Sequence, residues 1–193
     1  MSLATEEEFE NQVFNKEVCS GCDLKRKVFA HSSFESCDFT RASFTGSRFL
    51  ECKMHGCNLS LAKLDGCRLQ NVHFEDCKLV GVNFTKCERM FLSLTFKGCL
   101  IDTSNFSGLD LKGAFFRDCV IRDTYFTEAN LSGVDFSNTD LRGSTFHSTN
   151  LTKADFREAF NYSIDPSANK LAKAKFSKPE VLSLLSHLDI IID

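Results

Sequence analysis

A large apolar residue recurs at every fifth position along most of this chain. The series runs without a gap from Leu24 to Phe84, and it resumes with its phase shifted by two from Phe96 to Phe156. We call these positions the centres. A period of five fits neither an α-helix, which repeats every 3.6 residues, nor a strand, which repeats every two. The pattern therefore predicts a repeated unit made of a short extended segment followed by a turn.

Three residue types keep a fixed phase within this repeat. Seventeen of the 20 Phe are centres, nine of the 10 Cys lie two residues before a centre position, and all 10 Gly lie two residues after a centre. Alternation along an extended segment puts a centre and the residue two before it on the same side. A glycine at one constant position marks a turn where the backbone has a positive φ. We therefore expect a large and a small side chain from each unit to point inward.

The repeat has a second period of twenty residues. Steps of twenty in the second half give columns that keep their residue type, as in Phe106, Phe126 and Phe146, and in Leu111, Leu131 and Leu151. A column of this kind is expected when each coil holds four units and successive coils stack like neighbouring strands, ~4.8 Å apart. The sequence thus predicts an all-β, four-sided solenoid of between seven and eight coils.

The units resemble those of the pentapeptide-repeat family, for example ANLSG at 129–133, VDFSN at 134–138 and TDLRG at 139–143. The resemblance covers about residues 7–160. It implies a right-handed quadrilateral β-helix, to which the sequence adds a short C-terminal capping helix and an apolar tail. We divide the chain into a β-helix over 1–176, with a phase break at about 85–95, and a C-terminal helix and tail over 177–193.

The phase break leaves two interpretations open. Arg89 stands where a centre is expected, so one coil is interrupted. The interruption is either a bulge that the rod tolerates or a small protruding loop, and binding residues concentrate in loops on rigid scaffolds. The candidate loop residues are Glu88, Arg89, Met90 and Phe91.

The C-terminal segment reads as a helix that begins with a Ser177 cap, a proline in the first turn and Glu180 as the capping-box partner. An apolar stripe follows it and can cover the open end of the solenoid. Surplus apolar residues remain, which favours a two-fold homodimer. The candidate dimerisation residues are Leu182, Leu185, Leu188, Ile190, Ile191 and Ile192.

The formal net charge is −3, and the excess negative charge lies in the second half of the repeat region. A chain with nearly equal numbers of basic and acidic residues is not expected to bind nucleic acid directly. Between residues 99 and 160 nine acids face six bases, and these acids are the candidate partner-binding surface: Asp102, Asp110, Asp118, Asp123, Glu128, Asp135, Asp140, Asp155 and Glu158. No signal peptide or membrane-spanning stretch is evident, and ten cysteines then indicate free thiols in the cytoplasm.

No catalytic or metal-binding set emerges from the motifs. Cys19 and Cys22 form a CxxC pair, but both follow the phase of the repeat. Cys52, His55 and Cys57 have the spacing of metal ligands, yet the cysteines are expected to point inward and the histidine outward. We expect no cofactor and no metal, and we expect that the protein is not an enzyme.

Within the family the chain is most similar to members that protect bacterial topoisomerases: the Qnr quinolone-resistance type and the microcin B17 and albicidin immunity types. The segments that carry this likeness are GSTFHSTNLTKADF, NYSID and KFSKPEVLSLLSHLDIIID. The resemblance implies a dimeric rod that mimics duplex DNA, binds DNA gyrase and sometimes topoisomerase IV, and inhibits the enzyme or protects it from poisons. The alternative is an interaction scaffold with an unrelated protein partner.

Overall fold

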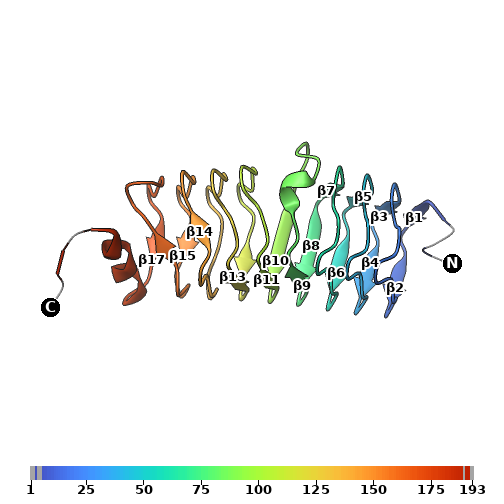
Figure 1. Ribbon diagram of the computed structural model, residues 1–193, viewed down its shortest axis with the longest axis horizontal. Helices are drawn as coiled ribbons and strands as arrows, with labels where there is room; N and C mark the ends of the chain where they lie inside the picture. The colour runs from blue at the N-terminus through green and yellow to red at the C-terminus, as the bar shows by residue number, and fades with distance from the viewer. Residues whose placement is uncertain (1–2, 4–5, 189, 192–193) are drawn as a thin grey trace.

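The protein is a straight rod built from one continuous parallel β-solenoid (Figure 1). The computed structural model describes residues 3, 6–188 and 190–191. About eight coils stack along the rod, and the two termini lie at opposite ends. The predicted fold class is therefore confirmed.

Each coil has four faces, which we number by their place in the coil, and short strands or isolated β-bridges link neighbouring coils on them. Face 1 holds β1 (Glu8–Glu10), β3 (Val28–Ala30), β5 (Arg48–Leu50) and β7 (Arg68–Gln70). Face 2 holds β2 (Val13–Asn15), β4 (Ser33–Glu35), β6 (Lys53–His55), β8 (Val72–Glu75), β10 (Leu94–Lys97), β12 (Phe116–Arg117), β15 (Asp155–Phe156) and β17 (Lys175–Phe176). Face 3 holds β9 (Lys78–Val80), β11 (Leu100–Asp102) and β13 (Val120–Arg122). Face 4 holds η1 (Phe84–Lys86), β14 (Thr145–Phe146) and β16 (Ser163–Ile164).

The register between coils is twenty residues, as the columns predict. Phe9 pairs with Phe29 and Phe29 with Phe49 in parallel strands, and the same step recurs beyond the break, where Phe96 pairs with Phe116. Across the break the step is 22 residues, since Phe74 pairs with Phe96. The phase shift of the sequence is thus an insertion of two residues into one coil.

The interior is filled by stacked aromatic rings. Phe126 is fully buried, and its ring lies nearly parallel to those of Phe106 and Phe146, at interplanar angles of 8° and 7°. It also meets Phe116 edge to face at 85°. Parallel stacking within a column and edge contacts between columns are both favourable geometries for aromatic pairs. The three Phe outside the centres, Phe91, Phe115 and Phe160, are not buried.

The small inward residue has a polar role besides filling space in the units where it is cysteine, serine or threonine. The Cys57 thiol lies 3.3 Å from the carbonyl oxygen of Phe34, and Thr149 donates to the carbonyl of Phe126 at 2.9 Å. Ser144 donates in the same way to Ile121. Buried carbonyl groups need hydrogen-bond partners, so this position favours cysteine, serine and threonine, which are small and can donate.

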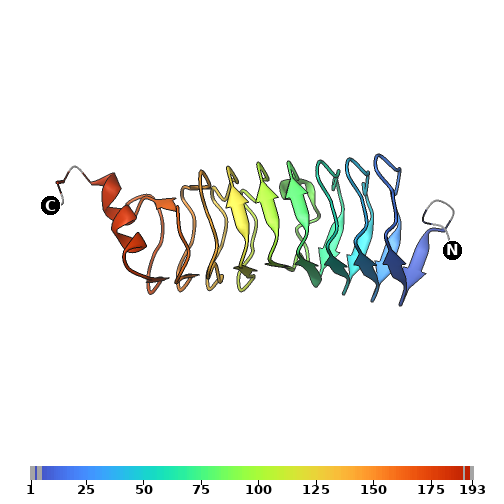
Figure 2. The ribbon, with the colours of Figure 1, turned by 90° about the horizontal axis from the view of Figure 1, so that it is seen from below.

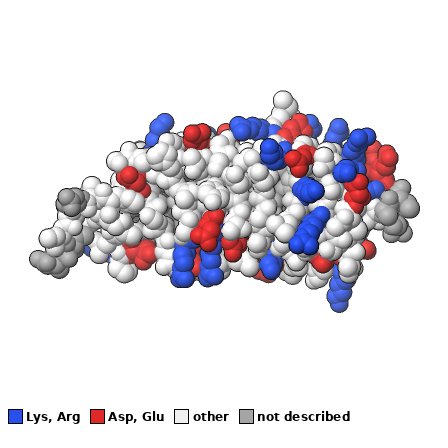
Figure 3. All heavy atoms as spheres, in the orientation of Figure 1, with Lys and Arg blue, Asp and Glu red and all other residues white. Residues whose placement is uncertain are grey.

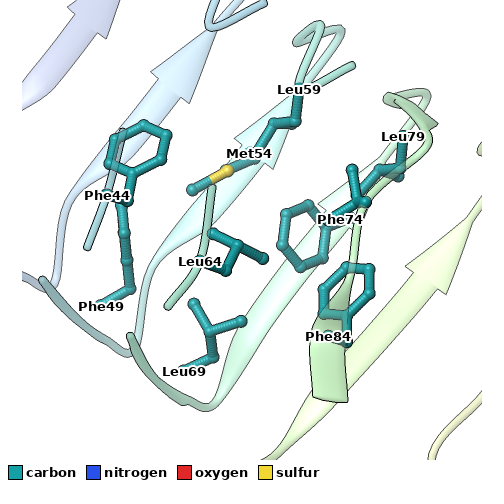
Figure 4. Close-up of a pocket in the computed structure, with 10 residues that line it drawn as sticks. Phe44, Phe49, Met54, Leu59, Leu64, Leu69, Phe74, Leu79 and Phe84 are labelled. Carbon is teal, nitrogen blue, oxygen red and sulfur yellow. The ribbon is translucent and has the colours of Figure 1, made fainter. Parts of the chain in front are cut away.

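One coil contains no phenylalanine. Its centres are Met54, Leu59, Leu64 and Leu69, and they line an apolar void of about 10 Å³ together with residues of the coils on either side (Figure 4). A methionine or leucine fills less of the column than a ring. The stack of aromatic rings on face 2 is therefore interrupted by the thioether side chain of Met54, which lies between Phe34 and Phe74.

The turns after most centres have a positive φ, as the glycine pattern predicts. Gly143 has a φ of +71°, and the equivalent Asn138 has a φ of +55°. Glycine adopts this conformation without steric cost, and asparagine tolerates it better than most residues.

The C-terminal end is covered by η2 (Glu180–His187), a 3₁₀ helix that lies across the last coil (Figure 2). The predicted Ser177 cap is wrong, because Pro179 precedes the helix and no side chain caps it. Ser177 instead accepts a hydrogen bond from the Glu158 backbone at 3.2 Å, and Glu180 accepts one from the Asn161 backbone at 2.6 Å. Both side chains satisfy amide groups of the coil beneath them.

Candidate functional site

The nine candidate acids are spread unevenly around the rod. The stacking register places four on face 2 (Asp118, Asp135, Asp155 and Glu158) and three on face 3 (Asp102, Asp123 and Asp140). Asp110 lies on face 1 and Glu128 on face 4. Seven of the nine therefore share two adjacent faces, and the other two lie away from them.

Three of these acids form ion pairs with basic residues of the same unit or of the adjacent coil. Arg117 contacts Asp135 at 2.6 Å, and Arg122 contacts Asp140 at 3.3 Å. Asp155 is held by Arg157 at 2.7 Å and by Lys175 at 3.3 Å. Hydrogen bonds from Arg157, with a smaller contribution from Lys175, lower the pKa of Asp155 to about 2 against the opposing effect of burial. Faces 2 and 3 thus carry mixed charge rather than a purely acidic sheet.

Two of the unpaired candidate acids, Asp118 and Glu158, share a line with Asp76 along the edge between faces 2 and 3. Asp118 and Glu158 occupy the same turn position two coils apart, and Asp76 occupies it two coils earlier. Gly98 and Asn138 fill the coils between them. Asp118 accepts a hydrogen bond from the Asn138 amide at 2.8 Å, which fixes its direction. We call Asp76, Asp118 and Glu158 the acidic edge; it is ~19 Å long at ~4.8 Å per coil.

The phase break forms a small loop that protrudes from the rod between β7 and β10 (Figure 1). Its base is fixed, since Glu88 accepts hydrogen bonds from Arg68 at 3.0 and 2.8 Å and Arg89 donates to the Gly108 carbonyl at 3.3 Å. Its tip is apolar, with Met90 63% and Phe91 60% exposed. The structure therefore has a protruding loop here; whether it binds a partner remains a prediction.

The candidate dimerisation residues lie at the C-terminal end, and most of them are exposed. Leu182, Leu188 and Ile190 are about half exposed, and Ile191 is 93% exposed. Leu185 is only half-buried in η2, whereas Leu184 packs against the core. Ile192 lies outside the described residues. Much of this apolar surface is thus not covered by the protein's own chain.

The cysteines and the histidine that have the spacing of metal ligands in the sequence do not converge in the structure. Cys52 and Cys57 point into the core, while His55 lies on the surface, 3.1 Å from Glu35 and 3.5 Å from Asp76. Burial and a hydrogen bond with Cys22 raise the pKa of Cys19 to about 12. Within the residues that the structure describes, no group of three His, Cys, Asp or Glu side chains could hold a metal ion, and no helix is long and apolar enough to cross a membrane.

Sequence reasoning missed one surface feature, a concentration of basic residues on face 4 and its edge with face 1 in the N-terminal half. Figure 3 shows basic side chains gathered over the N-terminal coils and beside the protruding loop, with acidic ones between them. The twenty-residue period also applies to charged residues, since it places Arg48 next to Arg68. It therefore predicts this concentration of basic residues from the sequence.

The Pentapeptide repeat region family model matches residues 27–106 and 89–160. Together these ranges cover more than half of the chain. The chain belongs to the pentapeptide repeat family. A comparison with curated protein sequences gives no match.

Solved structures of family members share the rod. A trypsin-treated variant of QnrB1, a plasmid-mediated fluoroquinolone resistance protein, superposes with a TM-score of 0.72 at 20% identity, over 97% of this chain and 90% of that chain. HetL from the cyanobacterium Nostoc sp. strain PCC 7120, involved in heterocyst differentiation regulation, superposes with a TM-score of 0.67 at 17% identity, over 86% and 84%. These likenesses establish the fold.

Proposed function

We propose that this pentapeptide-repeat protein binds a type II topoisomerase, namely DNA gyrase and by the same surface topoisomerase IV. In this role it is a cytoplasmic, non-enzymatic protein that inhibits the enzyme or protects it from quinolone-like or albicidin-like poisons. The proposal is supported by the likeness to a fluoroquinolone resistance protein along almost the whole rod.

The acidic edge is the observation that carries the proposal. Asp76, Asp118 and Glu158 project from one line on the rod, and the exposed carboxylates of Asp118 and Glu158 make no ion pair within the described residues. A regular row of carboxylates on a rigid rod can compete with phosphates for a basic groove, because the attraction depends on charge and spacing rather than on chemical identity. The rod then mimics DNA along this edge.

Supercoiling by purified gyrase tests the proposal. Protein at micromolar concentration is added with and without a fluoroquinolone or albicidin, and we expect either inhibition of supercoiling or recovery of supercoiling in the presence of the poison. The double variant Asp118→Asn/Glu158→Gln should weaken the effect at least tenfold. The control Asp110→Asn/Glu128→Gln removes the same charge from faces 1 and 4 and should act like wild type. No effect of the wild-type protein in either assay rejects the gyrase assignment.

We further propose that the protein is a homodimer joined through η2 and the residues that follow it. Leu182, Leu188, Ile190 and Ile191 expose apolar surface at one end of the rod, and a two-fold axis there covers the same patch on both copies. Light scattering at micromolar concentration should give twice the mass of 21.7 kDa. The variant Leu182→Glu/Ile191→Glu should give the monomer mass, and a monomeric wild type would refute the dimer.

A second candidate, an interaction scaffold for an unrelated protein, is favoured by the pairing of Asp135, Asp140 and Asp155 with basic residues. Ion pairs of this kind remove charge that a DNA mimic needs, and they leave a surface of mixed charge that can meet a protein of complementary charge. The gyrase assay separates the two candidates, since a scaffold for another partner leaves supercoiling unchanged.

A further inference from the structure

The N-terminal half of the rod carries a strip of basic residues that the acidic edge does not involve. It consists of six exposed side chains on face 4, its two edges, the adjoining column of face 1 and the base of the loop, which we call the basic strip: Arg26, Arg41, Arg48, Lys63, Lys86 and Arg89. None of the six forms an ion pair within residues 3, 6–188 and 190–191. The strip is therefore a region of positive potential on a chain whose net charge is negative.

The stacking register brings the six together. Lys63 follows Asp23 and Ser43 in one column of face 4, and Arg48 and Arg68 follow Val28 on the adjoining column of face 1. Between these columns a third runs from Arg26 through Gly46 and Gly66 to Lys86, where the Gly66 amide donates to the Lys86 carbonyl at 2.8 Å. From Arg26 to Lys86 the strip spans three coil steps, ~14 Å at ~4.8 Å per coil.

Few carboxylates oppose this charge on the same surface. Asp23 is engaged with Lys25 at 3.0 Å, and Glu88 is engaged with Arg68 at 2.8 Å. Asp65 is the one remaining acid among the positions of face 4 in these coils, and it forms no ion pair in the part of the chain that the structure describes. Glu6, Glu7 and Glu8 lie at the N-terminal end of these columns, where Glu8 pairs with Val28 and Val28 with Arg48, and they too form no ion pair among the described residues. The six cations thus outnumber four uncompensated carboxylates, three of which lie at one end of the strip. Beyond the loop, face 4 carries Asn105, Tyr125 and Thr145 at the column of Lys63, so the strip ends there.

The side chains between the cations indicate which anion fits. They are hydroxyl and amide groups, namely Ser43, Thr45, Asn83 and Thr85, with the Ser43 and Thr45 oxygens 3.1 Å apart. Protein interfaces depend on apolar and aromatic anchors, and single-stranded nucleic acid binds to stacked aromatic side chains. Face 4 itself offers neither in these coils; the exposed apolar side chains near the strip are Leu61 on its edge with face 3 and Met90 and Phe91 at the tip of the loop. Cations interspersed with small hydrogen-bond donors are instead the groups that contact the phosphates of a duplex.

We propose that the basic strip binds the phosphate backbone of duplex DNA, independently of base sequence. The assignment goes beyond the proposed function and does not depend on it, because it concerns another surface and needs no topoisomerase. It also differs from the prediction made from whole-chain charge, that the protein makes no direct contact with nucleic acid. The net charge averages over surfaces that the fold keeps apart, whereas binding depends on the local field.

Fluorescence anisotropy of a labelled 20-base-pair duplex with the full chain tests the proposal. We expect binding at 50 mM salt that weakens as the salt concentration is raised. A plot of the logarithm of the association constant against the logarithm of the salt concentration should have a slope of about −3, which corresponds to roughly three phosphate contacts. The variant Arg48→Glu/Lys63→Glu should lower the affinity at least tenfold. The control Lys53→Glu/Lys78→Glu makes the same change of net charge on faces 2 and 3 of the same coils, and it should stay within about threefold of wild type.

Three outcomes overturn the proposal. The first is no binding of the duplex by wild-type protein at 50 mM salt. The second is an equal loss in both double variants, which would mean that net charge alone matters. The third is displacement of the duplex by polyglutamate as readily as by unlabelled duplex at equal charge concentration, which would indicate an acidic protein segment as the occupant. Circular dichroism melting of all variants confirms that they remain folded.

Discussion

The ring of Phe126 lies 5.3 Å from the ring of Phe106, centroid to centroid, with the two planes inclined by 8°. Because Phe146 lies equally close on the other side, at 5.2 Å, Phe126 is enclosed by its own column. Replacing Phe126 by alanine should lower the free energy of unfolding by about 3–5 kcal/mol, through lost burial and the cavity left behind. Denaturant unfolding measures this.

The matched control for that experiment is Tyr125→Ala. Tyr125 precedes Phe126 in the same unit but points outward and is 51% exposed. Its replacement should cost less than about 1 kcal/mol, as is usual for surface positions. Equal losses in the two variants would contradict the stacked core.

Filling the void beside Met54 should stabilise the protein. Met54→Phe would continue the aromatic column between Phe34 and Phe74, next to a void of about 10 Å³ (Figure 4). Cavity-filling changes of this kind add about 0.5–2 kcal/mol. Thermal unfolding should show a higher Tm.

Leu141→Phe is the comparison for the Met54 variant. Leu141 is fully buried, and it continues the column of Ile101 and Ile121, away from the residues that line the void beside Met54. Overpacking there should destabilise by about 1–3 kcal/mol. A lower Tm for Met54→Phe as well would show that the coil from Met54 to Leu69 is already full.

The sequence predicts the core of this protein well because the fold is almost one-dimensional. Each inward side chain contacts the residue twenty positions away. The residues that pack together in a column, such as Leu111, Leu131 and Leu151, can therefore be read from the sequence. The pairing of Arg117 with Asp135 was missed because the two residues are 18 positions apart. Such diagonal contacts depend on side-chain direction and not on the period alone.

The error at Ser177 has a different origin. Local capping rules compare a side chain only with the helix that follows it. The last coil of a solenoid has amide groups with no further coil to receive them, and Ser177 and Glu180 accept two of these hydrogen bonds, from Glu158 and Asn161. Whether Ser177 caps the helix or bonds to the last coil therefore depends on how the helix packs on the end of the rod, which local sequence rules do not describe.

Stability should fall in acid as Asp155 becomes protonated. Since hydrogen bonds from Arg157 and Lys175 lower the folded-state pKa of Asp155 to about 2, its contribution is complete above the unfolded-state pKa of about 4 and is lost as the pH falls through about 2. The shift corresponds to about 2 kcal/mol. Denaturant unfolding of Asp155→Asn should therefore show a loss at pH 7 and a shallower decline between pH 4 and pH 2.

Glu128→Gln serves as the reference for Asp155→Asn. Glu128 is exposed on face 4 and forms no ion pair in the described ranges. Its variant should keep the pH profile of the wild type. If Asp155→Asn also keeps the full acid-dependent decline, the ion pairs with Arg157 and Lys175 do not stabilise the fold.

The thiols should be nearly inert while the protein is folded. Burial, helped by the nearby Asp65 carboxylate, raises the pKa of Cys87 to about 12, and nine of the ten cysteines are buried, Cys22 being the half-buried one. A thiol-specific reagent at pH 8 needs an accessible thiolate, so at most Cys22 should react rapidly in native protein, whereas all ten should react in denaturant. Rapid modification of several thiols without denaturant would contradict the closed core.

The contacts of Ser177 and Glu180 with the last coil should be visible by amide hydrogen exchange. Removing the acceptor in Ser177→Ala frees the Glu158 amide, and Glu180→Ala frees the Asn161 amide. Each variant should expose its own amide to faster exchange and cost about 0.5–2 kcal/mol, the usual effect of losing a cap. Ser186→Ala, within η2 but remote from both amides, should leave them protected. Unchanged protection of Glu158 and Asn161 would mean that the end of the rod is held by the apolar contact of Leu184 instead.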